Sequence, residues 1–237
     1  MSGRAGRIRI VGGSLRNSRL EVPELPGLRP TPERVRETLF NWLAPVLEGA
    51  RVLDLCAGTG ALGIEALSRG AAAAVFVEPD ARAARALRDN LARLKVVGAD
   101  VAVMDAQGFL RGAARPFDLV FLDPPFAANL WTALAQGLEQ GGWLAERAWI
   151  YVESPRELAP VLPAHWALHR EGRAGEVRFA LYRRALPQKG LPRLPQDSRR
   201  EQLARRSVKH EPADVRPRPG LAPLAANASY AEAGGRL

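Results

Sequence analysis

Short apolar runs alternate with longer segments of helical periodicity along residues 51–186. The apolar runs lie at residues 52–56, 74–78, 101–104, 117–122 and 149–153, and the intervening helical patterns at 61–68, 81–94 and 130–139. Strands that alternate with helices form a parallel sheet covered on both faces. We therefore expect an α/β fold over this part of the chain.

The end of this region predicts a change in strand direction. Residues 155–161 suggest one more helix. Two further apolar stretches, at 166–170 and 177–183, flank Gly172 and Gly175, which is typical of a hairpin. We expect this hairpin to place an antiparallel strand at the end of the sheet.

The first 50 residues carry a basic pattern. Residues 7–11 alternate like a strand, 12–14 form a turn and 15–22 return as a second strand. Thr31 at the N-cap and Pro32 in the first turn predict a helix. The candidate RNA-binding residues here are Arg7, Arg9, Arg29, Arg34 and Arg36. Solvated surface arginines would give the same pattern, so RNA contact by residues 1–50 is a hypothesis.

Composition narrows the class of protein. A chain of 237 residues holds one sizeable core, and its net charge of +9 indicates a polyanionic partner. Cys56 is the only cysteine, so we expect neither a disulfide framework nor a cysteine-based zinc site. No apolar run reaches the ~20 residues of a membrane span, and the N-terminus has no signal-peptide pattern. We expect a cytoplasmic protein with no membrane association and, by default, a monomer.

Residues 187–237 differ from the rest of the chain. They contain seven of the nineteen prolines, pairs of arginines and little apolar periodicity. We interpret them as a disordered, basic, proline-rich tail. Such a tail either adds non-specific affinity for RNA or is a solvated extension, and the sequence does not decide between these.

The strand at 117–122 ends abruptly in Asp123, Pro124, Pro125 and Phe126. Prolines lack an N–H donor and cannot continue a ladder, so this is a stiff loop at the carboxyl end of a buried strand, where α/β sheets bind ligands. A carboxylate and adjacent carbonyls can accept both hydrogens of an exocyclic amine while the aromatic ring stacks on its base. We therefore assign these four residues as catalytic candidates for transfer to a base amine.

A glycine-rich turn follows the strand at 52–56. Gly58 and Gly60 permit a tight turn and close backbone approach to a ligand, and the next helix begins there. Glu78 lies 20 residues after Gly58, at the end of the next strand, where an acid suits the two hydroxyls of a ribose. Nicotinamide and flavin binders share this pattern.

Three further features favour S-adenosylmethionine over a nicotinamide. Asp54 precedes the glycine turn, where its carboxylate can meet an amino-acid ammonium group that NAD lacks. Asp105 follows the strand at 101–104 and can accept from an adenine amino group, and we include the adjacent Ala106 in this cofactor site. The loop at Asp123 is directed at an amine rather than at a hydride acceptor. Together these residues indicate S-adenosylmethionine as the cofactor.

The chain resembles the bacterial 16S rRNA guanine-N2 methyltransferases of the RsmD family over roughly residues 7–185. The resemblance runs through residues 9–13, 29–43, 54–66, 121–126 and 151–153, and the segment 29–43 is the most particular to that family. Cys56 departs from it, because the family commonly has Phe there. The resemblance does not explain the tail.

This resemblance implies the class I methyltransferase fold, which is Rossmann-like with a seven-stranded, mostly parallel sheet. It implies methylation of one guanine of 16S rRNA on its exocyclic N2, in the small ribosomal subunit, with S-adenosylmethionine along the carboxyl edge of the sheet. By matching motif, Asp123 and the Pro124 carbonyl would hold the amine and Phe126 would stack on the guanine. No metal is needed.

Three other readings remain at this point. A DNA adenine-N6 or cytosine-N4 methyltransferase uses the same loop, although no evident target-recognition domain is present. A non-catalytic ribosome-assembly factor could keep the same fold and bind RNA. An NAD-dependent enzyme would bind NADH in place of S-adenosylmethionine.

Overall fold

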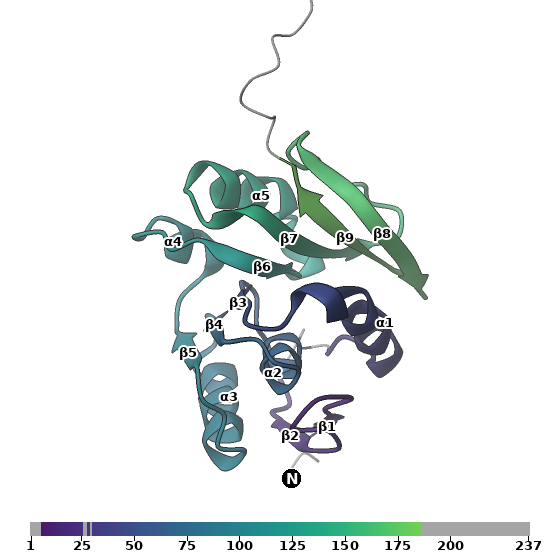
Figure 1. The fold of residues 1–237 in the computed structure, drawn as a ribbon. Coiled ribbons are helices and arrows are strands. Elements are labelled where there is room, and N and C mark those ends of the chain that lie inside the picture. Colours follow the sequence, from purple (N-terminus) through teal and green to yellow (C-terminus); the bar gives the residue numbers. More distant parts are fainter. Residues whose placement is uncertain (1–5, 26–27, 29, 186–237) are drawn as a thin grey trace, which may run out of the picture. The chain divides into compact units, whose positions relative to one another are not determined.

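The computed structural model describes residues 6–25, 28 and 30–185. Its centre is a seven-stranded sheet with strand order β5-β4-β3-β6-β7-β9-β8 (Figure 1). The first five of these strands are parallel, and β9 runs antiparallel between β7 and β8. The predicted α/β class, the number of strands and the terminal antiparallel hairpin are confirmed. The tail predicted at 187–237 lies outside the described residues.

The elements follow the predicted alternation. The sheet strands are β3 (Arg51–Asp54), β4 (Ala73–Val77), β5 (Ala99–Ala102), β6 (Phe117–Leu122), β7 (Leu144–Pro155), β8 (Trp166–Ala174) and β9 (Val177–Arg184). The helices are α1 (Glu33–Leu43), α2 (Ala61–Ser68), α3 (Ala81–Arg93), α4 (Ala106–Leu110) and α5 (Trp131–Gln140), with short 3-10 turns at Ala44–Val46 and Phe126–Ala128. A separate pair, β1 (Gly6–Arg9) and β2 (Arg19–Val22), precedes them.

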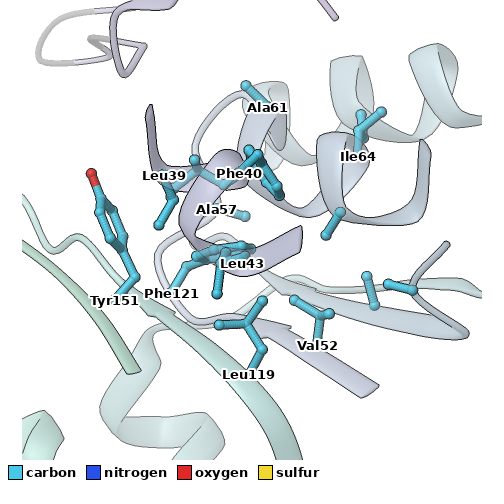
Figure 2. Close-up of a cluster of buried hydrophobic side chains, with 14 of the residues drawn as sticks. Leu39, Phe40, Leu43, Val52, Ala57, Ala61, Ile64, Leu119, Phe121 and Tyr151 are labelled. Carbon is cyan, nitrogen blue, oxygen red and sulfur yellow. The ribbon is translucent and has the colours of Figure 1, made fainter. Parts of the chain in front are cut away.

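Alternate residues of each strand enter two different hydrophobic clusters. Phe76 and Phe121 pack with α1, α2 and α3, as Figure 2 shows in part, whereas Val120 and Ile150 pack with α4 and α5. Because successive side chains of a strand point to opposite faces, each cluster belongs to one face of the sheet. Figure 1 shows α4 and α5 on one side and α1, α2 and α3 on the other.

The N-terminal hairpin belongs to the first cluster. Its Ile10 and Leu20 are fully buried there, beside residues of α1 and α2. The side chain of Asn90 on α3 pairs with the backbone of Glu21, accepting from its N–H at 2.9 Å and donating to its carbonyl at 2.8 Å. The hairpin is therefore held to the helical layer by apolar burial and by the side-chain amide of Asn90, which forms the same pair of hydrogen bonds with Glu21 that an adjacent strand would form.

Three local predictions are wrong. Residues 155–161 form no helix, because β7 continues to Pro155 and pairs with β9. Thr31 does not cap α1, whose N-cap is Pro32 with no side-chain hydrogen bond. The second strand of the hairpin begins at Arg19 rather than at residue 15, since the turn extends through Asn17 in the left-handed region at φ 68°.

Candidate active site

Four acidic residues lie at or near the carboxyl ends of four neighbouring strands, on the same face of the sheet. Asp54 ends β3, Glu78 and Asp123 directly follow β4 and β6, and Glu153 lies two residues before the end of β7. Asp54, Glu78, Asp123 and Glu153 each lie two residues beyond a side chain of the first hydrophobic cluster, namely Val52, Phe76, Phe121 and Tyr151. Their strands are adjacent in the order β4-β3-β6-β7. Side chains two residues apart on a strand share a face, so the four carboxylates form a row along the carboxyl edge.

The glycine-rich turn is held against the first of these acids. Asp54 Oδ2 accepts from the N–H of Gly63, in the first turn of α2, at 3.0 Å. Gly58 and Gly60 have φ values of 51° and 73°, in the region that favours glycine. A Cβ on Gly60 would also lie 2.3 Å from Leu87 Cδ1. The turn therefore requires glycine both for its conformation and for its packing.

Asp54 is a buried carboxylate that lacks a cationic partner. Burial raises its pKa to about 7, the Gly63 N–H opposes that shift and the charge of Glu78 adds to it. Among the ion pairs of the described residues, none includes Asp54. A ligand ammonium at this point would satisfy a charge that the protein leaves unbalanced.

Glu78 is oriented by two backbone donors. Its Oε2 accepts from Gly58 N and its Oε1 from Asp80 N, both at 2.8 Å. Burial raises the pKa of Glu78, while these two hydrogen bonds oppose the rise. The carboxylate is thus held beside the glycine turn, as binding of a ribose requires.

Asp105 and Ala106 lie at the start of α4, three residues after β5 ends. Asp105 is its N-cap, and its Oδ1 accepts from Gly108 N at 2.7 Å. Asp105 is exposed and Ala106 is buried. The strand predicted at 101–104 lies two residues earlier, at Ala99–Ala102, and Asp105 is the N-cap of α4 at the same edge of the sheet.

The loop after β6 places a carboxylate beside an exposed ring. Asp123 is half-buried and Pro124 is buried, whereas Pro125 is exposed and Phe126 is 40% exposed. The Phe126 ring lies 5.9 Å from that of Trp131 in α5, tilted by 49°. Burial raises the pKa of Asp123 well above its usual range, and the charges of Glu153 and Asp54 raise it further. This arrangement presents an acceptor and a stacking surface together.

Glu153 is the member of the row to which the sequence interpretation assigned no role. It is 6% exposed, and its Oε2 accepts from the Tyr151 hydroxyl at 2.8 Å. Figure 2 shows that hydroxyl directed away from the apolar cluster. Burial raises the pKa of Glu153, and hydrogen bonds from Tyr151 and Thr31 oppose the rise. The repeated spacing of an acid two residues after a buried apolar residue was the signal that could have identified it.

Comparisons with known proteins agree with this geometry. A protein-family model described as Conserved hypothetical protein 95 matches residues 8–183. The chain belongs to this family. A relative from Escherichia coli K12 named "Ribosomal RNA small subunit methyltransferase D" is 52% identical over 181 residues, covering 76% of this chain and 91% of the relative. One of the same name from Haemophilus influenzae is 41% identical, covering 75% of this chain and 94% of its own.

Solved structures show the same fold. A putative methyltransferase from Escherichia coli matches with a TM-score of 0.72 and 49% identity, over 77% of this chain and 100% of its own. An RNA methyltransferase from Salinibacter ruber in complex with S-adenosyl-L-homocysteine matches with a TM-score of 0.53 and 19% identity, over 70% and 97% of the two chains. The predicted resemblance to the RsmD family, the class I fold and the methyltransferase class are confirmed.

In this member of the family, Cys56 lies among the acids rather than inside a strand. β3 ends at Asp54, so Cys56 falls in the turn and is half-buried. Burial raises its pKa, as do the charges of Asp123, Asp54 and Glu78. The thiol therefore stays protonated and is a weak nucleophile.

The candidate RNA-binding arginines divide into different environments. Arg36 is only 2% exposed, and its guanidinium contacts Glu65 at 3.2 Å and the Arg9 carbonyl at 2.9 Å. The prediction that Arg36 contacts RNA is therefore wrong, because the N–H groups of its guanidinium donate to acceptors inside the protein. Arg7, Arg9 and Arg34 are exposed, and Arg29 lies outside the described residues.

Two other features of the described residues bear on function. They contain no group of three or more His, Cys, Asp or Glu side chains arranged to hold a metal ion. None of the helices described is both long enough and apolar enough to cross a membrane.

Proposed function

We propose that this protein transfers a methyl group from S-adenosylmethionine to the exocyclic N2 of a guanine in 16S rRNA of the small ribosomal subunit. The observation that carries the proposal is the placement of Asp123 and Phe126 at the same sheet edge as the glycine turn and Asp54. The names of the relatives point to ribosomal RNA of the small subunit.

The residues of the turn fit S-adenosylmethionine. The unbalanced Asp54 carboxylate matches an amino-acid ammonium, and Glu78 matches a ribose diol. The exposed Asp105 and the start of α4 at Ala106 match an adenine. When bound, this cofactor supplies a methyl group on a positively charged sulfur. None of the ion pairs among the described residues includes Asp54, Glu78, Asp123 or Glu153. This negative charge without an arginine or lysine partner favours a cationic ligand over an anionic one.

Asp123 acts on the amine of the guanine. Its carboxylate and the Pro124 carbonyl accept the two N2–H bonds, so the nitrogen lone pair turns away from the ring and towards the methyl carbon. The amine has to lose one proton when it gains a methyl group, and the Asp123 carboxylate would accept that proton. The raised pKa of Asp123 makes it a stronger base than an ordinary aspartate.

Phe126 and the rigid loop supply positioning. Correct placement of two reactants accounts for about 7–11 kcal/mol of a barrier. Extracting a base from its stack costs a few kcal/mol, and stacking on an aromatic ring returns about 1–3 kcal/mol. The packing of Phe126 against Trp131 fixes the ring before the base arrives.

The rRNA would be bound partly through its phosphates. A basic surface on the hairpin and α1, formed by the exposed Arg7, Arg9 and Arg34, would contact these phosphates. We further propose that the enzyme acts as a monomer in the cytoplasm, where ribosomal subunits assemble.

Replacement of Asp123 tests the assignment. Asp123→Asn and Asp123→Ala should abolish transfer to small subunits while the affinity for S-adenosylmethionine, measured by calorimetry, stays within a few-fold of the unmodified protein. Asp118→Asn, an exposed change on the same strand, is the matched control and should keep transfer. Loss of cofactor affinity in the Asp123 variants would instead place Asp123 in the cofactor site.

A further inference from the structure

Glu153 and Asp123 occupy matching positions on two adjacent parallel strands. Phe121 on β6 is the register partner of Tyr151 on β7, and their rings lie 6.1 Å apart. Leu122 and Val152 are the next partners. One residue further, Asp123 follows the end of β6 and Glu153 lies beside it in β7, on the face that carries Phe121 and Tyr151.

Glu153 is held rigidly in this position. The hydroxyl of Tyr151, from the same strand face, donates to Glu153 Oε2 at 2.8 Å. The indole N–H of Trp131 donates to the Glu153 carbonyl at 2.7 Å, and Trp131 in turn packs on Phe126. Trp131 thus contacts both the Phe126 ring and the backbone of Glu153, so it fixes the position of that ring relative to Glu153.

A second acid beside Asp123 exceeds what binding of an amine requires. Asp123 and the Pro124 carbonyl already provide acceptors for both hydrogens of an exocyclic amine. Glu153 already accepts from Tyr151 and Thr31, but a carboxylate has about four acceptor sites, so it can take a further donor from the substrate. Burial raises the pKa of Glu153, while hydrogen bonds from Tyr151 and Thr31 oppose that rise and favour the charged form, which can only accept.

The Watson–Crick edge of guanine offers that donor. Next to its N2 amine, guanine carries an N1–H, whereas the ring nitrogens beside the amines of adenine and cytosine carry lone pairs. An ionised carboxylate accepts from the first and repels the other two. The same Asp-Pro-Pro-Phe loop on its own would not make this distinction.

We propose that Glu153 is the specificity-determining residue of this enzyme, accepting the N1–H of the guanine whose N2 is held by Asp123. This inference rests on the proposed function. In this proposal, Glu153 on β7 distinguishes guanine from the other bases, and the loop after β6 recognises the exocyclic amine.

The test compares guanine with 2-aminopurine at the methylated position. The wild-type enzyme first identifies that position, and small subunits are then reconstituted with 16S rRNA carrying either base there. 2-Aminopurine keeps the N2 amine but has a lone pair at N1. A hydrogen bond to a charged group changes a rate by about 10- to 100-fold. The wild-type enzyme should therefore methylate guanine at least about tenfold faster than 2-aminopurine.

Glu153→Gln should reduce this preference at least tenfold, because an amide can present its oxygen to N1–H or its nitrogen to a lone pair. Glu146→Gln, an exposed change on the same strand, should leave the preference unchanged. A purely structural role of Glu153 would slow both bases equally and keep the wild-type ratio, which would overturn the inference. So would a wild-type ratio near one. If the wild-type enzyme methylates no guanine, the proposed function itself fails.

Discussion

The guanidinium of Arg36 and the carboxylate of Glu65 form a buried ion pair with a distance of 3.2 Å between Nη1 and Oε2. Glu65 also accepts from the backbone N–H groups of Val11 and Gly12 at 2.8 and 2.7 Å, and from Arg69 at 2.9 Å. One carboxylate on α2 thus joins the hairpin, α1 and α2. Because α2 directly follows the glycine turn of the proposed cofactor site, this pair connects the proposed RNA-binding surface with that site.

Removal of one partner should therefore destabilise the protein strongly. Glu65→Ala leaves the Arg36 charge buried and two backbone donors unsatisfied, which we expect to cost about 3–5 kcal/mol in the free energy of unfolding. Chemical denaturation measures this value. Glu21→Ala breaks the exposed pair with Arg7 and should cost less than about 1 kcal/mol. Equal losses in the two variants would contradict the role assigned to Glu65.

The raised pKa of Asp54 should make the stability of the ligand-free protein depend on pH. Its pKa is about 7 when folded and 3.8 when exposed, so between these values the folded state binds more protons than the unfolded state. Stability should then fall as pH rises from about 4 to 7, by up to about 4 kcal/mol. Thermal unfolding should show that Asp54→Asn flattens this fall, whereas Asp100→Asn, on the exposed face of β5, does not.

Binding of S-adenosylmethionine should follow the opposite trend. An ammonium group favours the ionised form of Asp54, so the affinity should rise as pH increases towards and through 7 and should level off above it. Calorimetry at a series of pH values measures this, with Asp54→Asn expected to bind weakly and with less pH dependence. An affinity that falls with pH in the unmodified protein would place the ammonium elsewhere.

Arg7 and Arg9 should contribute to RNA affinity by neutralising phosphates. Each forms an exposed ion pair in the free protein, with Glu21 and Glu33, and such pairs are weak enough to exchange for phosphate. Replacing both by Ala should lower affinity and reduce the slope of log affinity against log salt by about 0.7 for each single-strand phosphate that is no longer neutralised. Filter binding measures both quantities. Replacement of both Arg170 and Arg173 by Ala, at two exposed positions of the edge strand β8, is the charge-matched control. Unchanged affinity after the double replacement would exclude the hairpin from the RNA interface.

Much of the fold follows from local patterns in the sequence. The alternation of apolar runs with helical segments identifies the parallel strands, and Asp123 and Phe126 stand out because two prolines end a buried strand. The helix predicted at 155–161 fails for a tertiary reason. Ser154 and Pro155 resemble a helix start, but antiparallel pairing of Pro155 with Val177 extends β7 instead.

Partners distant in sequence account for the other errors. Arg36 reads as a surface arginine because nothing nearby reveals Glu65, 29 residues away, as its partner. The position of Glu153 beside Asp123 depends on β6 and β7 being adjacent, which local patterns do not specify. The four acids that each follow a buried apolar residue by two positions were visible in the sequence, but only the strand order shows that they lie in one row.

The central claim is the transfer of a methyl group to N2 of a guanine in 16S rRNA. The most direct measurement incubates the protein and labelled S-adenosylmethionine with small subunits from cells that lack the enzyme, and then separates the nucleosides of the rRNA. The account predicts label in N2-methylguanosine alone, and none with Asp123→Ala. Label in a different methylated nucleoside, or no label despite tight binding of the cofactor, would contradict it.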